Sequence, residues 1–279
     1  MLSILFSPDF YWIVLLGVGL LGLMVGSFLN VVIVRLPQML LESNKEDASL
    51  PPFNLVLPPS HCPQCQHSIP WYQNIPLFSF LWLKGRCANC QKPISFRYPL
   101  VEFLSLSLSL ILALQFNLTP SLAGGLILTW GLIALSFIDI DHTLLPDDIT
   151  LPFIWLGLLF NAFGVFTDPA SAILGASFGY FVLWSVFWVF KWITKKDGLG
   201  FGDFKLLAML GAWLGWQALP FIILLSSFLG AVFGLSLMYF KGVKKETPIP
   251  FGPFLALAGY ITLIWGPHLT LFYYRLMVL

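Results

Sequence analysis

Long apolar runs separated by short polar connections occupy almost the whole chain. A helix needs about 20 apolar residues to cross the hydrocarbon core of a bilayer. The stretches that reach or nearly reach this length lie at 11–34, 98–117, 121–138, 149–167, 170–191, 203–218, 219–240 and 251–273. The pattern therefore predicts an all-α polytopic membrane protein with about eight transmembrane helices, the sixth and seventh separated only by a turn from Gly215 to Pro220.

The basic residues indicate which side of the membrane each connection faces. With eight alternating spans, all of the 14 Lys and Arg except Arg275 fall on one side. Cytoplasmic connections carry the excess of Lys and Arg, so both termini are expected to lie on the opposite side of the membrane from the cytoplasm. The first apolar run lacks a basic flank and an A-x-A-type cleavage site, and we expect it to be a retained span.

The composition excludes a soluble globular protein. Hydrophobic residues make up 58% of the chain and charged residues 10%, whereas about a quarter of the residues are charged in soluble domains. The 27 Phe and 11 Trp suit a surface that faces the lipid bilayer and its interfaces. The net charge of +1 gives no indication of a nucleic-acid partner.

The only sizeable polar segment is a cytoplasmic loop, residues 35–97, that carries all four cysteines. Its charged beginning, 41–50, is expected to be mobile. The chain is thus expected to divide into a first transmembrane helix (1–34), a cytoplasmic loop domain (35–97) that carries the cysteines, and a seven-helix transmembrane core (98–279).

Two C-x-x-C motifs in this loop predict a metal site. Each motif can present two thiolates to one tetrahedral ion, and structural disulfides do not persist in the cytoplasm. We expect one structural Zn²⁺ that stabilises the loop, with His61 and His67 outside the ligand set because four sulfurs complete it. The expected ligands are Cys62, Cys65, Cys87 and Cys90.

Two acidic residues are expected where apolar helices meet the cytoplasmic face. Asp139 continues one apolar run without a break, and Asp203 begins another. Acidic residues at a membrane edge are functional candidates, and two such carboxylates can share a proton as in aspartic proteases. The glycines before Asp203, including Gly200 and Gly202, are expected to allow positive φ and close approach of a substrate strand.

Each of these features also has a structural interpretation. Asp139 alone could form a salt bridge, and Asp141, Asp147 and Asp148 are expected to be solvated or to cap a helix. The pairs Gly175/Gly179 and Gly230/Gly234 predict close approach of helix backbones.

The ordered set of motifs resembles the bacterial type IV prepilin peptidases. The resemblance covers about residues 26–257 and rests on the G-x-G-D segment 200–203, the segment 26–37 (GSFLNVVIVRLP), the paired C-x-x-C loop, 97–102 (RYPLVE), 139–147 (DIDHTLLPD) and 248–254 (PIPFGPF).

This resemblance implies a bifunctional enzyme. Asp139 and Asp203 correspond to the catalytic aspartates, although the spacing leaves Asp141 open in place of Asp139. Gly200, Gly202, Asp141 and Lys205 would support the catalytic segment. The family cleaves the leader of prepilins and pseudopilins after glycine, then methylates the new N-terminus with S-adenosylmethionine.

The second activity and two other functions stay open. Glu102, with Arg97, could bind the substrate amine or the methyl donor, or Glu102 could be a structural partner of Arg35 or Arg97. A transporter that relays protons or cations through Asp139, His142 and Asp203 is an alternative, although its acids would be expected near the midplane. A zinc-stabilised envelope scaffold without catalysis is another.

Overall fold

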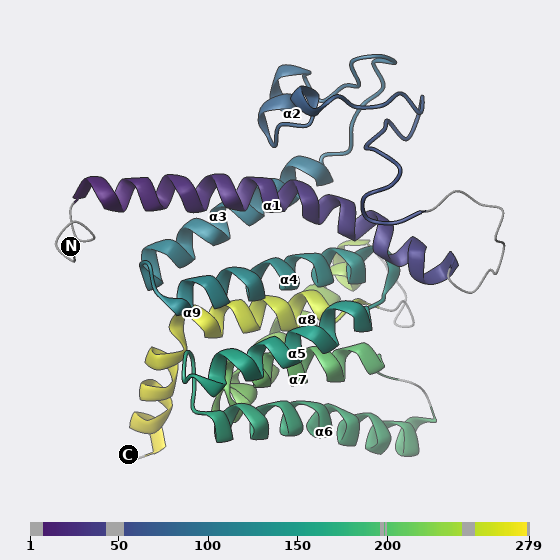
Figure 1. Cartoon of the computed structure of the whole chain (residues 1–279). Helices are drawn as coiled ribbons and strands as arrows, with labels where there is room; N and C mark the ends of the chain where they lie inside the picture. The colour runs from purple at the N-terminus through teal and green to yellow at the C-terminus, as the bar shows by residue number, and fades with distance from the viewer. Residues whose placement is uncertain (1–7, 43–52, 196–197, 199, 242–248, 278–279) are drawn as a thin grey trace. The chain divides into compact units, whose positions relative to one another are not determined.

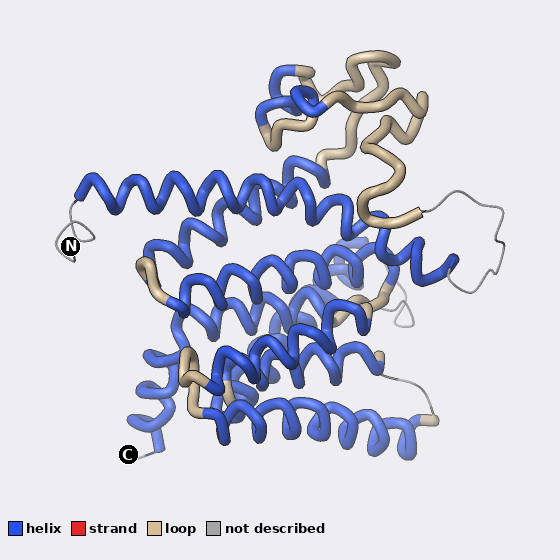
Figure 2. Tube along the Cα trace, in the orientation of Figure 1, coloured by secondary structure: helices blue, strands red, loops and turns tan. Residues whose placement is uncertain are grey.

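The computed structural model describes residues 8–42, 53–195, 198, 200–241 and 249–277. Within these ranges the backbone forms helices and turns and contains no β-strand (Figure 2). The all-α prediction is confirmed. Most of the stretch 41–50, which we expect to be mobile, lies outside the described residues.

Nine α-helices follow one another in the described part of the chain (Figure 1). They are α1 (Pro8–Glu42), α2 (Phe78–Trp82), α3 (Arg97–Phe116), α4 (Pro120–His142), α5 (Asp147–Ala162), α6 (Pro169–Thr194), α7 (Phe201–Leu214), α8 (Leu219–Lys241) and α9 (Gly252–Met277), with 3₁₀ turns η2 (Trp71–Gln73) and η3 (Trp216–Ala218). The predicted turn after α7 is confirmed, because Gly215 has φ of 84°.

Five of these helices are long and apolar enough to cross a membrane: α1, α3, α4, α6 and the segment that contains η3 and α8. The helices α5 and α7 have 16 and 14 residues, and the apolar segment of α9 found among the described residues is Gly252–Gly266. The chain is therefore a multi-pass membrane protein. It divides into two compact units, residues 1–122 and 123–279.

In the first unit, α1 and α3 pack side by side through small residues (Figure 1). A Cβ added to Gly26 would lie 2.8 Å from the Cα of Glu102. One turn away, the Ser105 hydroxyl donates a hydrogen bond of 2.6 Å to the carbonyl of Gly22. A polar side chain is thus satisfied by helix backbone where the two helices approach most closely.

The helix α1 is longer than the expected span 11–34 and continues past Pro37. In this extension Arg35 is only 8% exposed. Its guanidinium donates to the carbonyls of Asn54 at 3.0 Å and Pro58 at 2.7 Å, and it lies over the ring of Phe53. Arg35 therefore ties the beginning of the described loop to α1.

In the second unit, α6 and α7 form the tightest contact. A Cβ on Gly175 or on Gly211 would overlap the carbonyl of the other residue, and a Cβ on Gly179 would lie 2.6 Å from the carbonyl of Leu207. The close approach predicted for Gly175 and Gly179 is confirmed. The prediction for Gly230 and Gly234 is wrong, because the atoms nearest to their added Cβ atoms in the described part of the chain belong to side chains and not to a neighbouring backbone.

The helix α7 is also fixed to α5, in part by a buried amide. Asn161 is fully buried. It donates to the carbonyls of Ala212 and Trp213, both at 2.8 Å, and accepts from the backbone N–H groups of Phe166 and Thr167. All hydrogen-bonding groups of this amide are satisfied, so the C-terminal end of α7 has one defined position against α5.

The packing of α6 on α7 leads to a stability prediction. Gly211→Ala is expected to lower the free energy of unfolding by about 1–3 kcal/mol, because the new methyl group forces the two backbones apart. Thermal unfolding of the detergent-solubilised protein measures this change. Gly17→Ala is the matched control, since no atom lies within 4 Å of a Cβ at that position. Equal unfolding temperatures of the two variants would contradict this packing.

Candidate active site and metal centre

The four cysteines come together in the loop after α1. Their sulfur atoms all lie within 4.8 Å of one another, and the sulfurs of Cys62 and Cys90 are 3.9 Å apart. A tetrahedral ion with metal–sulfur distances of about 2.3 Å would separate its ligands by roughly 3.8 Å. The cluster can therefore hold one metal ion.

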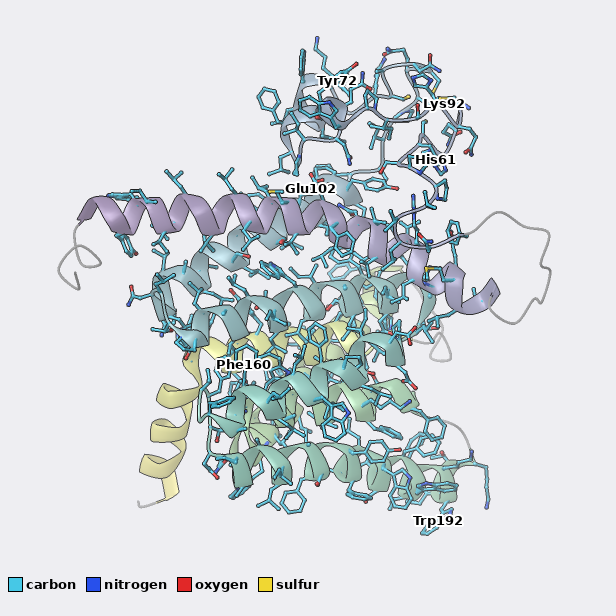
Figure 3. The ribbon with its side chains drawn as sticks, in the orientation of Figure 1. His61, Tyr72, Lys92, Glu102, Phe160 and Trp192 are labelled. Atoms are coloured by element: carbon cyan, nitrogen blue, oxygen red, sulfur yellow. The ribbon has the colours of Figure 1, made fainter. Side chains whose placement is uncertain are left out.

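The two C-x-x-C motifs fold in the same way, 25 positions apart. In the first motif, the N–H of Cys62 donates to the carbonyl of His67, and the N–H of Gln66 donates to the carbonyl of Cys62. The second motif repeats these two bonds, from Cys87 to Lys92 and from Gln91 to Cys87. Figure 3 shows His61 and Lys92, which flank these turns, in the same part of the loop. Each turn presents its own pair of sulfurs, so the metal site requires both motifs.

Hydrogen bonds to sulfur favour thiolates at two cysteines of this cluster, whereas at Cys90 the bond from the Lys92 backbone is outweighed by burial and the neighbouring sulfurs, which raise the pKa to about 11. At Cys65, the backbone N–H of His67 and then the Asn89 side chain lower the pKa to about 6. At Cys87, the backbone N–H groups of Cys90 and Asn89 lower the pKa below its ordinary value. Thiolates are the forms that bind metal ions, so the donor set has the chemistry of a metal centre.

Asp139 lies in the last turn of α4, only 5% exposed. Its Oδ2 accepts a hydrogen bond of 2.9 Å from the backbone N–H of Gly252, the first residue of α9. The N-terminus of a helix carries a partial positive charge. The position of this carboxylate is thus set by helices that are more than a hundred residues apart in the sequence.

Asp203 lies in the first turn of α7, only 6% exposed. Its Oδ2 accepts a hydrogen bond of 3.1 Å from the backbone N–H of Gly200, and its own N–H donates to the Gly200 carbonyl. The side chain therefore closes the turn that begins α7. The expected positive φ is absent at Gly198, Gly200 and Gly202.

Leu145 connects the surroundings of the two carboxylates. A Cβ added to Gly202 would lie 2.7 Å from the Leu145 Cβ, and one added to Gly252 would lie 3.1 Å from the Leu145 Cδ2. The structure thus brings together the end of α4 and the beginnings of α7 and α9. Gly202 is required because a larger side chain would collide with Leu145, and not because the backbone needs a positive φ.

An ion pair lies close to Asp203 in the sequence, near the beginning of α7. The ammonium group of Lys205 is 2.7 Å from both carboxylate oxygens of Asp147, so the beginning of α7 is bound to the first turn of α5. Lys205 is half-buried and Asp147 is exposed. The sequence did not predict this pair, because a charge near a helix start equally fits capping.

The remaining acidic residues differ from the two buried aspartates in exposure. Asp141 and His142 at the end of α4 and Asp148 in the first turn of α5 are exposed. Asp139 is buried, whereas Asp141 is exposed. Burial therefore distinguishes two aspartates that sequence spacing alone does not distinguish.

Glu102 is buried in the first unit and bound to the cysteine loop. Its Oε2 accepts a hydrogen bond of 2.8 Å from the backbone N–H of Leu77, and its carboxylate also bonds the Ser27 side chain. Figure 3 shows Glu102 beside α1 near the base of the loop. Of its two suggested partners, Arg35 binds carbonyls of the loop, and the Arg97 guanidinium lies 5.9 Å from the ring centre of Tyr98.

Comparison with known proteins agrees with these motifs. Residues 20–116 match the family described as the bacterial peptidase A24 N-terminal domain, and residues 126–235 match the type IV leader peptidase family. No solved structure matches the chain significantly.

Curated relatives cover nearly the whole chain. A prepilin leader peptidase/N-methyltransferase of Aeromonas hydrophila is 51% identical over 273 residues, 94% of each chain. A protein of the same name from Pseudomonas aeruginosa is 53% identical over 90% of each chain. One from Dichelobacter nodosus is 47% identical over 90% of this chain and 92% of its own. This chain therefore belongs to the type IV leader peptidase family, the A24 peptidases.

Proposed function

We propose that this protein is a membrane aspartic endopeptidase and N-methyltransferase. It removes the leader of type IV prepilins and pseudopilins after glycine and then methylates the new N-terminal residue. The names of its curated relatives support both activities. The observation that supports the peptidase is the presence of two buried carboxylates, Asp139 and Asp203, on separate helices whose surroundings both contact Leu145.

In the proposed mechanism the two carboxylates share one proton. Two like charges close together in a poorly hydrated place do not both ionise readily, so the pair titrates as a unit. The ionised carboxylate takes a proton from water, which attacks the peptide carbonyl, while the protonated one donates a hydrogen bond to the carbonyl oxygen. Gly200 and Gly252 hold the two carboxylates with backbone N–H groups.

The other supporting residues are proposed to position the helix segments that carry the two aspartates. Lys205 would fix the beginning of α7 against α5 through Asp147, and Gly202 allows Leu145 to lie against the turn that carries Asp203. Asp141, exposed two residues after Asp139, would contribute negative charge near the site.

We place this active site at the cytoplasmic face of the bacterial inner membrane. The distribution of Lys and Arg supports eight spans with periplasmic termini. A precursor with an apolar helix in the bilayer would then present its leader where Asp139 and Asp203 lie.

The ion in the four-cysteine cluster is proposed to be a structural Zn²⁺. Four thiolates leave no open position for water, so the ion would stabilise the loop 35–97 rather than catalyse. Cys62, Cys65, Cys87 and Cys90 would hold it.

For methyl transfer, Arg97 and Glu102 are the proposed contributors in the first unit. Glu102 has the chemistry to hold a cationic amine, since a buried carboxylate favours a positive partner. S-adenosylmethionine, when bound, supplies the methyl group.

The proposal is tested by incubating purified enzyme with a precursor that carries its leader and apolar segment. Cleavage after the leader glycine is the expected result. A folded enzyme that leaves the precursor intact but carries protons or cations across proteoliposomes would favour the transporter. Neither activity would favour the scaffold.

The contact between Asp139 and Gly252 gives a further prediction. Gly252→Ala is expected to lower the cleavage rate about 10–100-fold, because a Cβ there would lie 2.7 Å from the Asp139 Oδ2 and displace the carboxylate. Initial rates of leader cleavage measure the effect. Gly266→Ala in the same helix is the control, since its nearest neighbour would be 3.8 Å away. Unchanged cleavage by Gly252→Ala would show that this contact does not position Asp139.

A further inference from the structure

An apolar groove runs between α6 and α8 in the second unit. Its volume is about 370 Å³, within the range of about 300–1,000 Å³ found for ligand sites. Its walls include Val182 and Val186 of α6, Ser227, Gly230 and Ala231 of α8, and Phe251 before α9.

Small residues of α8 keep this groove open. Around a Cβ added to Gly230, the nearest atoms are ring carbons of Phe254 and Phe251 at 3.5 and 3.7 Å, which is ordinary contact. Between α6 and α7, in contrast, Gly175 meets the backbone of Gly211 directly. The small side chains of α8 therefore expose a surface instead of bringing two helices of this unit together.

The wall of the groove includes a residue next to the one that holds Asp139. Phe251 forms part of its wall, and the next residue, Gly252, donates its N–H to the Asp139 carboxylate. An apolar segment in the groove would therefore contact the residue that precedes Gly252, whose N–H group holds the Asp139 carboxylate.

We propose that this groove binds the apolar helix of the precursor, in the part that follows the cleaved bond. The inference rests on the proposed function and adds the surface that recognises the substrate. The walls are almost wholly apolar, and small residues let a helix backbone approach closely in lipid. Laying an apolar helix in such a groove is a recurrent mode of recognition, and the position next to Gly252 would hold the scissile bond at the carboxylates.

Photo-crosslinking from α6 tests this assignment. A benzoylphenylalanine residue replaces Val186, which lines the groove, or Val189, which does not. The two positions are matched, since they are 50% and 51% exposed on the same helix. The full-length enzyme, with Asp203→Asn to keep the precursor intact, is irradiated in proteoliposomes with a precursor that has its leader and apolar segment.

The expected result is a crosslink from position 186 to the apolar segment of the precursor and at most a weak one from position 189. Crosslinks from 186 only to lipid, or only to a second copy of the enzyme, would overturn the proposal. So would equal capture of the precursor from both positions. Cleavage by the unmodified enzyme is measured in parallel. If the enzyme cleaves the precursor but position 186 does not crosslink to it, the groove assignment is wrong and the peptidase assignment stands.

Filling the groove provides an independent kinetic test. Gly230→Leu is expected to raise KM for the full precursor about tenfold or more, because the larger side chain occupies the space of the bound helix. Gly17→Leu, on a surface with no atom within 4 Å of a Cβ, is the control. Equal KM values of Gly230→Leu and the unmodified enzyme for the precursor would overturn the proposal.

Discussion

Asp139→Asn and Asp203→Asn are each expected to lower leader cleavage about a thousandfold or more, with little change in folding. An amide has the shape of the carboxylate but can neither take a proton from water nor share one with its partner. Loss of one member of a catalytic unit typically removes this much of the rate. Initial rates with a prepilin precursor measure the effect.

The double variant is expected to be no slower than either single one, because groups that act as a unit are strongly non-additive. Asp148→Asn is the matched control, an exposed aspartate in the first turn of α5, and should retain its cleavage rate. Independent, multiplicative losses in the double variant would contradict a shared-proton pair. Normal cleavage by Asp203→Asn would contradict the mechanism itself.

Cys87→Ser is expected to abolish stoichiometric metal binding and to unfold the loop between α1 and α3. Structural zinc contributes about 10–16 kcal/mol of binding free energy in small zinc domains, and this loop has few buried apolar side chains, with Cys62 among them. Metal analysis of reduced protein gives the stoichiometry, and limited proteolysis within residues 53–96 reports the unfolding.

His67→Ala is the control for the metal site. Its side chain is exposed, and the variant keeps the backbone N–H that donates to Cys65. It should therefore bind one equivalent of Zn²⁺ as the unmodified protein does. Less than one equivalent in the unmodified protein, or a full equivalent in Cys87→Ser, would contradict a four-thiolate zinc centre.

Features with a short sequence signature were predictable. Two C-x-x-C motifs bring four sulfurs together because each motif fixes its own pair locally. Asp139 and Asp203 stood out because each lies at the end of an apolar run, where a carboxylate needs a special environment. The close approach of a helix backbone at Gly175 and Gly179 followed from the spacing of these glycines in α6, although their partners in α7 did not.

Features that depend on distant partners were not predictable. The bond of Gly252 to Asp139 joins two helices whose register no local pattern encodes. The pair of Lys205 with Asp147 likewise requires the relative rotation of α5 and α7. Gly230 and Gly234 have the same spacing as Gly175 and Gly179, yet Gly230 borders a groove. The spacing of glycines does not determine whether another helix packs against them.

Mass spectrometry of a precursor incubated with the purified enzyme and S-adenosylmethionine tests the central claim most directly. The precursor should lose its leader after glycine and then gain the mass of one methyl group, and Asp203→Asn should leave the precursor at its full mass. A precursor that stays at full mass with unmodified, folded, metal-loaded enzyme would contradict the proposed function.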